Sequence, residues 1–504
     1  MRPVNRSHLL LLLAATVTVQ SATAAIVALA ARAGARALPP AVKGVQGVDD
    51  DGMTRLTFSM GNGTLEARYA TQLRLLAPSV RRYNVFWQSL EASIPPSPTP
   101  LQCPPTHISA GGGAFRLHHC YDRATVESFD RILALDASIG AASAFITYGS
   151  PDWAQEAGCT GFPWPPTPNF YKLGCLPWNS LDAYYDYILF LAARWNAPWG
   201  SGKARLSGIC VWNEVQSLGW SDPSPVLPNR QPAAGPLFTP AQFDTYASII
   251  ANLTILAGQA AAVAAAGAAG SDPAFIWLST DHFLTAPTIP PGGVGHLGLF
   301  DLLTAMWPKI WAAGVPFGIA VHPYDAGDPR EDLTKEGIYT FATLAASVGA
   351  FQCAQLGRVG GVPPSQCAAW PHTQMWASEQ GWPTGRAMNK TLQARNICLA
   401  HALSVAQRLW AVTHNLFQSA VPAHQGGGGD FSLIDEPPVV AADLSNGPGH
   451  ATFDAYAATA PGVFGASDGH YCCKSWAVGC LDPYKQKKIG VRFYAGVRSA
   501  HKQL

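Results

Sequence analysis

LSGICVWNEV, Leu206 to Val215, is an apolar run that ends in Trp212, Asn213 and Glu214. A strand that is apolar along its whole length must be covered on both faces, as a strand in a parallel sheet is. The polar residues at its end then lie where the strand leaves the core. In a parallel α/β barrel, the chemistry takes place at this carboxyl end of the strands.

A second run ends in the same way. In TQMWASEQGW, Thr373 to Trp382, Glu379 has the place that Glu214 has in the first run. Two strands that each bring one carboxyl group to a shared cleft form the arrangement that glycoside hydrolysis requires. Each glutamate alone could be a solvated loop carboxylate or half of a structural salt bridge, but two at matching strand ends favour the catalytic interpretation.

Strand-like and helix-like segments alternate along the rest of the chain. The pattern predicts strands at 53–60, 80–87, 142–148, 206–215, 274–280, 315–321, 373–382 and 411–417, and helices at 64–77, 125–138, 181–195, 240–268, 297–313, 333–348, 391–410 and 484–500. This rhythm, with right-handed crossovers, predicts an α/β fold, a (β/α)8 TIM barrel. The Pro- and Gly-rich segments 93–120, 154–179, 220–240 and 424–480 predict long loops, and 93–120 is too irregular for any regular element.

Composition limits the partners. The chain has 504 residues, 48 % hydrophobic and 13 % charged, which fits one elaborated barrel over residues 39–504. A formal net charge of +1 gives no broad field to attract nucleic acid or anionic lipid, so we expect a neutral substrate. We also expect a monomer and no cofactor. We expect no metal, because the adjacent His118 and His119 project differently and have no third ligand nearby in the sequence.

The N-terminus predicts a targeting segment. Arg2 and Arg6 precede an apolar run from Leu9 to Val19, which small residues follow, as in a secretory signal peptide. The apolar character continues to Leu38, so we assign residues 1–38 to targeting; an uncleaved membrane anchor and an organelle transit sequence are the alternatives. After cleavage we expect no membrane association, and we interpret the Ala-rich segment 253–269 as a barrel helix.

The eleven cysteines favour an oxidising compartment, and thus a secreted, extracellular or cell-wall protein, with an organelle lumen as the alternative. Pairs flank the predicted loops: Cys103 with Cys120, Cys159 with Cys175, Cys353 with Cys367, and Cys472 or Cys473 with Cys480. Cys210 and Cys398 lie in predicted regular elements, where a free buried thiol is usual. Sequons at Asn62, Asn252 and Asn389 are consistent with a secreted glycoprotein.

Other strand ends also carry polar residues. Alternation in the strand 80–87 places Arg82 on the face of Val80, and a buried arginine needs an anionic partner, which a carboxylate at the barrel mouth would supply. Asp281 and His282 end another strand and are either substrate contacts or ordinary loop residues.

These residues resemble those of clan A of the glycoside hydrolases, the retaining β-glycosidase barrels that include many endoglucanases, mannanases and xylosidases. In that clan, an Asn-Glu pair at the end of strand four carries the general acid/base, and a Glu at the end of strand seven is the nucleophile. The resemblance therefore implies that Glu214 is the acid/base, that Asn213 binds the sugar 2-OH, and that Glu379 attacks the anomeric carbon.

The resemblance extends to strands two and six. Arg82 resembles the strand-two arginine that pairs with the nucleophile. His322 and Tyr324 resemble the strand-six His and Tyr that line the site and hold the nucleophile; simple packing of His322 at a strand end is the alternative.

The clan usually has an aromatic residue at the end of strand eight, where this chain has Leu416, Phe417 and Gln418. The expected sugar platform is therefore Trp382 or Trp212. Trp153, which follows the strand 142–148, is a further candidate for stacking on a sugar; core packing is the alternative for these tryptophans.

The sequence thus predicts a secreted, cofactor-free retaining glycoside hydrolase that cleaves β-glycosidic bonds of an oligo- or polysaccharide. Glu214 would carry a proton at working pH, whereas Arg82 would keep Glu379 ionised. Retention requires the two carboxyl groups roughly 5 Å apart. The alternative is a catalytically silent carbohydrate-binding barrel of the cell wall or extracellular matrix.

Overall fold

The computed structural model describes residues 45–50 and 63–415, except 77, 92, 157–158, 160–173, 199–200, 219–220, 222–237, 269–270, 286–295, 325–328, 337, 368–369, 371–372, 383–395, 398, 402 and 405–406. Several predictions fall outside these residues: the targeting segment 1–38, a disulfide to Cys480, the state of Cys398, the strand-eight residues 416–418 and the closing helix at 484–500. They stay predictions.

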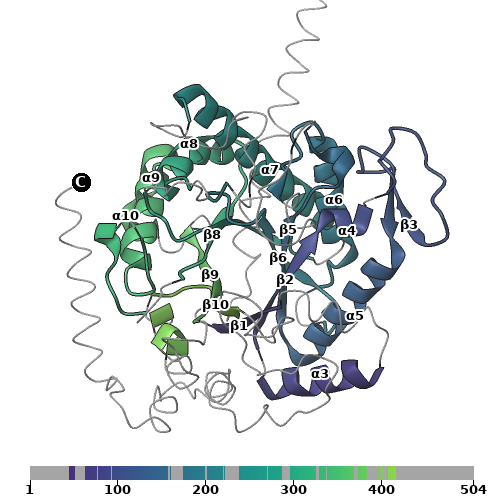
Figure 1. Cartoon of the computed structure of the whole chain (residues 1–504), viewed down its shortest axis with the longest axis horizontal. Helices are drawn as coiled ribbons and strands as arrows, with labels where there is room; N and C mark the ends of the chain where they lie inside the picture. Colours follow the sequence, from purple (N-terminus) through teal and green to yellow (C-terminus); the bar gives the residue numbers. More distant parts are fainter. Residues whose placement is uncertain are drawn as a thin grey trace, which may run out of the picture.

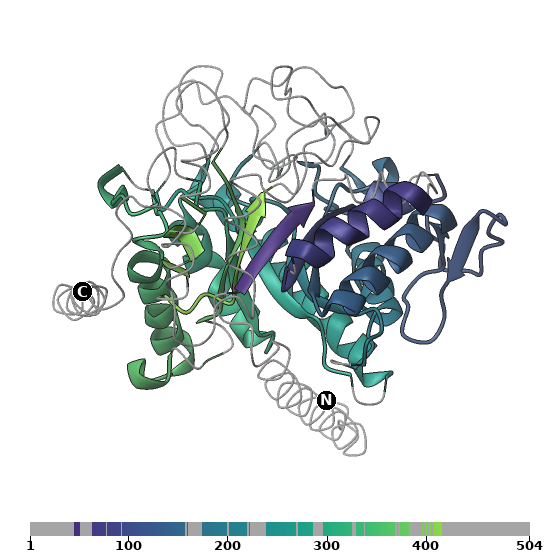
Figure 2. The same ribbon diagram turned by 90° about the horizontal axis from the view of Figure 1, so that it is seen from below.

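Parallel strands form a closed barrel at the centre of the molecule (Figure 1). Around the barrel the order is β1 (Val45–Asp50), β2 (Val80–Phe86), β5 (Ala142–Tyr148), β6 (Leu206–Val211), β7 (Phe275–Thr280), β8 (Phe317–Val321), β9 (Met375–Gln380) and β10 (Ala411–Asn415). β10 pairs back to β1, and the two lie side by side in Figure 2. Order around the barrel follows order along the chain, so the predicted (β/α)8 fold is confirmed.

Helices surround the barrel and connect successive strands. They are α3 (Gly63–Leu76), α5 (Arg123–Ile139), α6 (Leu181–Arg194), α7 (Pro240–Ala266), α8 (Leu299–Ala312) and α9 (Ala350–Gly360). Their ends follow local chemistry: the Asp122 side chain accepts a 2.7 Å hydrogen bond from the Thr125 backbone N–H, and Thr239 and Gln242 form a capping box in front of α7. The predicted helix at 391–410 is helical at the described residues 396–397, 399–401 and 403–404.

The first strand corrects the sequence prediction. The strand of the barrel is Val45–Asp50 (VQGVDD), not 53–60, which lies outside the described residues. This segment lacks apolar alternation because Gly47 and two aspartates interrupt it. Its place is fixed instead by backbone pairing on both sides, where Val48 lies opposite Arg81 of β2 and His414 of β10.

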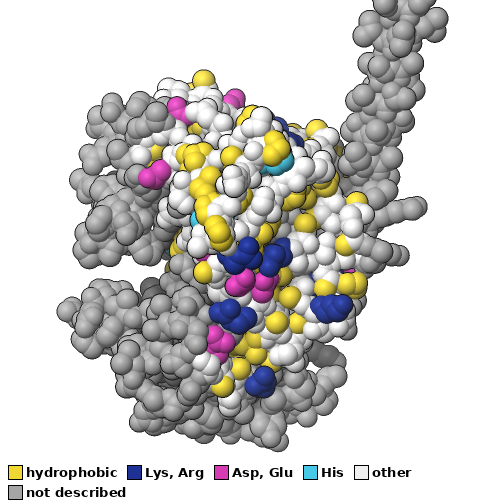
Figure 3. All heavy atoms as spheres, turned by 90° about the vertical axis from the view of Figure 1, so that its right-hand side faces the viewer, with side chains coloured by type: hydrophobic (Ala, Val, Ile, Leu, Met, Phe, Trp, Pro, Cys, Tyr) yellow, Lys and Arg dark blue, Asp and Glu magenta, His cyan; other side chains and the backbone are white. Residues whose placement is uncertain are grey.

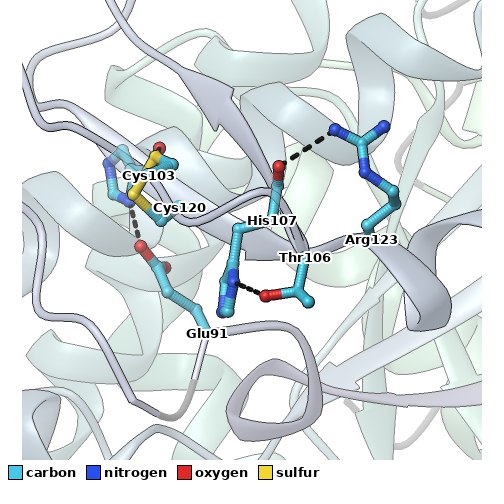
Figure 4. Close-up of a disulfide and its surroundings, with 7 residues drawn as sticks. Glu91, Cys103, Thr106, His107, Cys120 and Arg123 are labelled. Carbon is cyan, nitrogen blue, oxygen red and sulfur yellow. Dashed lines mark hydrogen bonds and ion pairs between the residues drawn. A yellow bond between two sulfur atoms is a disulfide. The ribbon is translucent and has the colours of Figure 1, made fainter.

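Segment 93–120 is also more regular than predicted. β3 (His107–Ala110) and β4 (His119–Asp122) form an antiparallel hairpin, and β4 contacts the short helix α4 (Trp87–Glu91). Figure 4 shows the Cys103–Cys120 disulfide beside it, with the Arg123 guanidinium donating to the His107 carbonyl at 3.1 Å. The Pro and Gly residues that suggested an irregular loop lie outside the two short strands, which backbone pairing holds together.

The helix after β8 lies later in the chain than predicted. In place of a helix at 333–348, the structure has a short 3-10 turn, η3 (Thr334–Glu336), then a π-helical turn, η4 (Ala345–Gly349), which leads into α9. Gly357 and Gly360 weaken the helical pattern of α9 in the sequence, and tertiary packing overrides this propensity. The disulfide from Cys353 to Cys367 joins α9 to α10 (Pro364–Cys367), rather than the ends of a loop.

The cysteine predictions that the structure tests are confirmed. The pairs Cys103–Cys120, Cys159–Cys175 and Cys353–Cys367 are disulfides, and the buried thiol of Cys210 forms no disulfide. Among the described residues, α7 is the one helix long and apolar enough to cross a membrane, with half of its most apolar window buried. It packs against α6 and α8 on the barrel wall, as expected of a barrel helix.

The barrel interior is filled by indole rings. Trp277 of β7 lies with its ring centroid 5.5 Å from Trp376 and 5.0 Å from Trp410, and all three side chains are buried. Small residues on the neighbouring strands make room for Trp277, since a Cβ at Gly318 would lie 2.6 Å from its ring and 2.8 Å from the Gln374 carbonyl oxygen.

We therefore expect Gly318→Ala to lower the free energy of unfolding by about 1–3 kcal/mol, the usual cost of overpacking a close-packed core. Gly357→Ala is the matched control, because Gly357 is exposed on α9 and the new methyl group meets only the Val362 carbonyl oxygen at 3.8 Å. That change should stabilise by about 0.5–1 kcal/mol. Urea denaturation of both variants checks the pair, and equal effects would contradict the packing of Trp277.

Candidate active site

Four strands of the barrel bring the predicted polar residues together. Glu379 lies on β9, Glu214 follows β6, and Arg82 lies on β2. His322 and Tyr324 follow β8. These residues are far apart in the sequence and meet because all barrel strands run in the same direction.

Arg82 and Tyr324 both contact the carboxyl group of Glu379. Its Oε2 lies 2.9 Å from Arg82 Nη2, and its Oε1 accepts a 2.5 Å hydrogen bond from the Tyr324 hydroxyl. The Arg82 side chain is 1 % exposed, whereas that of Glu379 is 18 % exposed and so is accessible to a ligand. The anionic partner that the sequence requires for Arg82 is therefore present, and it is Glu379.

His322 lies between the two glutamates. Its Nδ1 is 2.8 Å from Oε1 of Glu214, and its Nε2 is 3.6 Å from Oε2 of Glu379. The imidazole is fully buried, and the Glu214 side chain is 14 % exposed. One ring thus contacts both carboxyl groups, which places them in a single site; their separation of roughly 5 Å stays a prediction.

The backbone that carries Glu214 is strained. Trp212 and Glu214 have φ angles of 60° and 40°, in the left-handed region that side chains with a Cβ rarely adopt. The Val215 N–H donates to the Ser279 carbonyl at 3.1 Å, and the Glu214 N–H donates to Ser279 Oγ at 3.3 Å, so β7 holds this turn in place. Strain of this kind is concentrated at functional sites.

The surroundings push the two glutamates in opposite directions. Burial raises the pKa of Glu214, and the charges of Asp281 and Glu379 add to this, while His322 opposes it. Burial would also raise the pKa of Glu379, but the charges of His322 and Arg82 and the Tyr324 hydroxyl outweigh it and lower the pKa. Two carboxyl groups with opposite shifts can serve as proton donor and nucleophile.

Asp281 is a buried anion near Glu214. His282 Nδ1 lies 2.6 Å from its Oδ1 and His296 Nδ1 lies 2.9 Å from its Oδ2. Burial opposes ionisation, but hydrogen bonds and charges of the two histidines hold the pKa of Asp281 far below its usual range. Its charge therefore acts on Glu214. The sequence does not reveal this, because His296 comes from a separate segment.

Ser279 is a site residue that the sequence reasoning missed. Its Oγ lies 3.4 Å from His322 Nε2 and accepts from the Glu214 backbone. The sequence could have indicated this residue, since alternation along β7 places the polar Ser279 on the same inward face as Trp277.

The other predicted residues differ in their surroundings. Asn213 is 6 % exposed, and its Oδ1 accepts from Arg82 Nη2 at 3.5 Å, which places it in the same cluster. Trp212 and Trp382 are 0 % and 1 % exposed, so a sugar ring stacked on either would need the packing around it to change. Trp153 lies apart in η1 (Asp152–Ala154), where its Nε1 donates to the Glu91 carbonyl at 3.0 Å.

Comparison with known proteins gives structural likeness only. No protein-family model matches the chain, and no curated protein matches it. Similar solved structures include a family 39 glycoside hydrolase from the gut symbiont Bacteroides cellulosilyticus WH2, with 12 % identity and a TM-score of 0.46 over 84 % of this chain and 64 % of that one. An exo-β-1,4-mannosidase from Opitutaceae bacterium strain TAV5 has 14 % identity and a TM-score of 0.43 over 82 % and 58 %.

A broad-specificity endoglucanase from Clostridium acetobutylicum has 12 % identity and a TM-score of 0.41, over 82 % of this chain and 95 % of that one. The chain spans less than two thirds of the length of the first two proteins. At such identities and TM-scores no activity follows for this chain, and the function must be argued from the site itself.

The opposite pKa shifts predict opposite effects of glutamine substitution on stability. The pKa of Glu379 is lowered by folding, so its ionisation stabilises the protein above the unfolded pKa of about 4.3, and this contribution is lost as the pH falls through the folded value. Glu379→Gln should therefore lower the free energy of unfolding at pH 7 by roughly 2–4 kcal/mol, because the buried Arg82 loses its anionic partner.

The pKa of Glu214 is raised by folding, so its stabilising contribution is complete below the unfolded pKa and is lost as the pH rises through the folded value. Glu214→Gln should therefore be neutral at pH 7 or stabilise by up to about 1–2 kcal/mol. Urea denaturation at pH 7 and pH 4 measures the free energy of unfolding of both variants. The differences from the wild-type protein should be smaller at pH 4 than at pH 7. Equal destabilisation by both variants at pH 7 would show that the two sites do not differ electrostatically.

Proposed function

We propose that the protein is a retaining glycoside hydrolase that cleaves β-glycosidic bonds of an oligo- or polysaccharide, with Glu214 as acid/base and Glu379 as nucleophile. One observation carries the proposal: two partly accessible carboxyl groups at strand ends share the imidazole of His322, and their pKa values are shifted in opposite directions. This is the pairing that two-carboxylate glycoside hydrolysis requires.

In the first step, ionised Glu379 attacks the anomeric carbon while protonated Glu214 donates its proton to the departing glycosidic oxygen. The bond from the anomeric carbon to the leaving group breaks as the bond to Glu379 forms. Arg82 and the Tyr324 hydroxyl orient the nucleophile and keep it deprotonated. Charged Asp281 favours the protonated form of Glu214.

In the second step, Glu214, now ionised, removes a proton from water, which attacks the anomeric carbon and releases Glu379. Two displacements at the same carbon retain its configuration. Asn213, held beside Arg82, would bind the sugar 2-OH in both steps. The net charge of +1, with nearly equal numbers of basic and acidic residues, suits a neutral sugar as substrate. Three disulfides fit a secreted protein.

Glu379→Ala should abolish turnover of aryl β-glycosides, because no group remains to form the glycosyl-enzyme. Azide should restore activity to this variant and give a β-to-α inverted glycosyl azide, which proton NMR of the product identifies. Glu331→Ala is the matched control, since it removes an exposed carboxylate after β8 and should keep full activity.

Full activity of the Glu379→Ala variant would refute the assignment of the nucleophile. Binding of polysaccharides by the wild-type protein without hydrolysis, across a panel of aryl β-glycosides and plant or algal polysaccharides, would favour the silent carbohydrate-binding barrel instead.

Tyr324→Phe should shift the acidic limb of the pH profile of kcat/KM to higher pH and so make the profile narrower. The hydroxyl that lowers the pKa of Glu379 is lost, so that pKa rises, and the nucleophile becomes protonated at higher pH. We expect the acidic limb to move up by about one pH unit, the shift that one charge-assisted hydrogen bond supports. The alkaline limb, which reports Glu214, should stay in place. Movement of the alkaline limb alone would indicate that Glu379 is the acid/base and Glu214 the nucleophile.

A further inference from the structure

A second cleft lies apart from the glutamate pair. It has a volume of about 460 Å³, and it is lined by residues 95–96, 117, 153 and 178–183. Trp153 follows the carboxyl end of β5 and α6 begins beside it, so the cleft opens on the same end of the barrel as the glutamates.

Two indoles give the cleft aromatic walls. Trp153 and Trp178 are both partly exposed. The Trp153 ring is fixed, because its Nε1 donates to the Glu91 carbonyl and its centroid lies 5.4 Å from that of buried Trp87. Pro95 and Leu117 extend the apolar lining. Rigid aromatic faces bind flat apolar surfaces without a large loss of side-chain entropy.

The opposite wall is held equally firmly. The backbone N–H of Leu117 donates to Asp186 of α6 at 2.7 Å, and the same carboxyl group accepts from the Arg116 N–H at 2.9 Å. The segment that carries Leu117 and the helix α6 are therefore joined by these hydrogen bonds. A pre-formed cleft of this kind loses little freedom when a ligand binds.

Polar groups share the lining. Asn179, Ser180 and Asp182 lie at the start of α6, and the Ser180 side chain makes no capping hydrogen bond to the helix. A purely apolar ligand would cover the Ser180 hydroxyl without giving it a hydrogen-bond partner, which is unfavourable.

The one charged residue of the cleft lining is paired. Asp182 forms an ion pair with Arg116, whose guanidinium lies 4.0 Å from the centre of the Tyr185 ring. On the face shown in Figure 3, positive and negative side chains likewise lie next to one another among apolar and uncharged ones. A charged ligand would find no unpaired counterion among the residues that line the cleft.

Ring faces, scattered hydrogen-bonding groups and no net charge match a sugar, which has apolar C–H faces and a rim of hydroxyl groups. We propose that this cleft binds a neutral oligosaccharide segment and so holds part of a polymeric substrate away from the bond that is cleaved. The role in catalysis rests on the proposed hydrolase function, whereas binding of the sugar does not.

The test measures binding and hydrolysis separately. In the non-hydrolysing Glu379→Ala background, cello-, manno-, xylo- and laminari-hexaose are titrated by isothermal calorimetry, with and without Trp178→Ala. We expect Trp178→Ala to weaken binding of the hexaose that binds by about tenfold, the value of one aromatic stacking contact. Trp178→Phe should retain most of the affinity, since it keeps a ring face. In the active protein, Trp178→Ala should lower kcat/KM for the hexaose relative to that for an aryl monoglycoside.

Trp370→Ala is the matched control, because it removes another partly buried indole, next to Trp311, which does not line the cleft. It should leave the affinity unchanged, and thermal unfolding of all variants confirms that they fold. Equal affinity of the Trp178 variant and its parent, or binding of none of the four hexaoses, would overturn the proposal. Binding that depends on Trp178 in a protein without hydrolytic activity would keep the cleft and reject the hydrolase function.

Discussion

The buried ion pair between Arg82 and Glu379 is the interaction on which the site depends. Arg82 is on β2 and Glu379 on β9, and the barrel closes between them through β1 and β10. A guanidinium without exposed surface is tolerated inside a protein only with an anionic partner. The strand VQGVDD, β1, pairs with β2 and with β10 and so completes the barrel between them. β1, the strand with the weakest apolar alternation in the sequence, therefore lies with β10 between β2, which carries Arg82, and β9, which carries Glu379. Its pairing helps to determine how closely these two side chains approach each other.

The difference between the two glutamates does not come from burial, since both side chains are buried to a similar degree. It comes from their partners. Glu379 has a cation and a hydroxyl donor within hydrogen-bond distance, whereas Glu214 has the anionic Asp281 nearby and shares His322 with Glu379. Because His282 and His296 keep Asp281 ionised, residues that do not touch either glutamate help to determine which of them holds the proton.

Elements that are buried on both faces could be predicted from sequence, and elements defined by backbone pairing could not. β5 was predicted to the residue and β6 from its start, because continuous apolar runs indicate strands covered on both sides. β1 and the hairpin of β3 and β4 have no such pattern. In the site, Glu214, Glu379, His322 and Tyr324 were predictable as strand-end residues, and Arg82 as a buried arginine in an apolar strand that needs an anionic partner. The contact of His296 with Asp281 was not, because it depends on how two separate segments fold over the barrel.

A second set of buried charges fixes the hairpin that forms one wall of the cleft. His119 of β4 has its Nδ1 2.6 Å from Glu91 and its Nε2 3.1 Å from Asp186, and all three side chains are buried. Burial alone would lower the pKa of His119, but the hydrogen bonds and charges of Asp186 and Glu91 raise it to about 9.

The imidazolium of His119 therefore persists at neutral pH and compensates charge that would otherwise be unpaired in the core. It joins α4, β4 and α6, while the Cys103–Cys120 disulfide ties the same hairpin covalently. Asp186 bonds both to this imidazole and to the Leu117 N–H. Asp186 thus takes part both in the charge balance of the core and in the position of the cleft wall, so a shift of the hairpin would disturb the buried ion pairs.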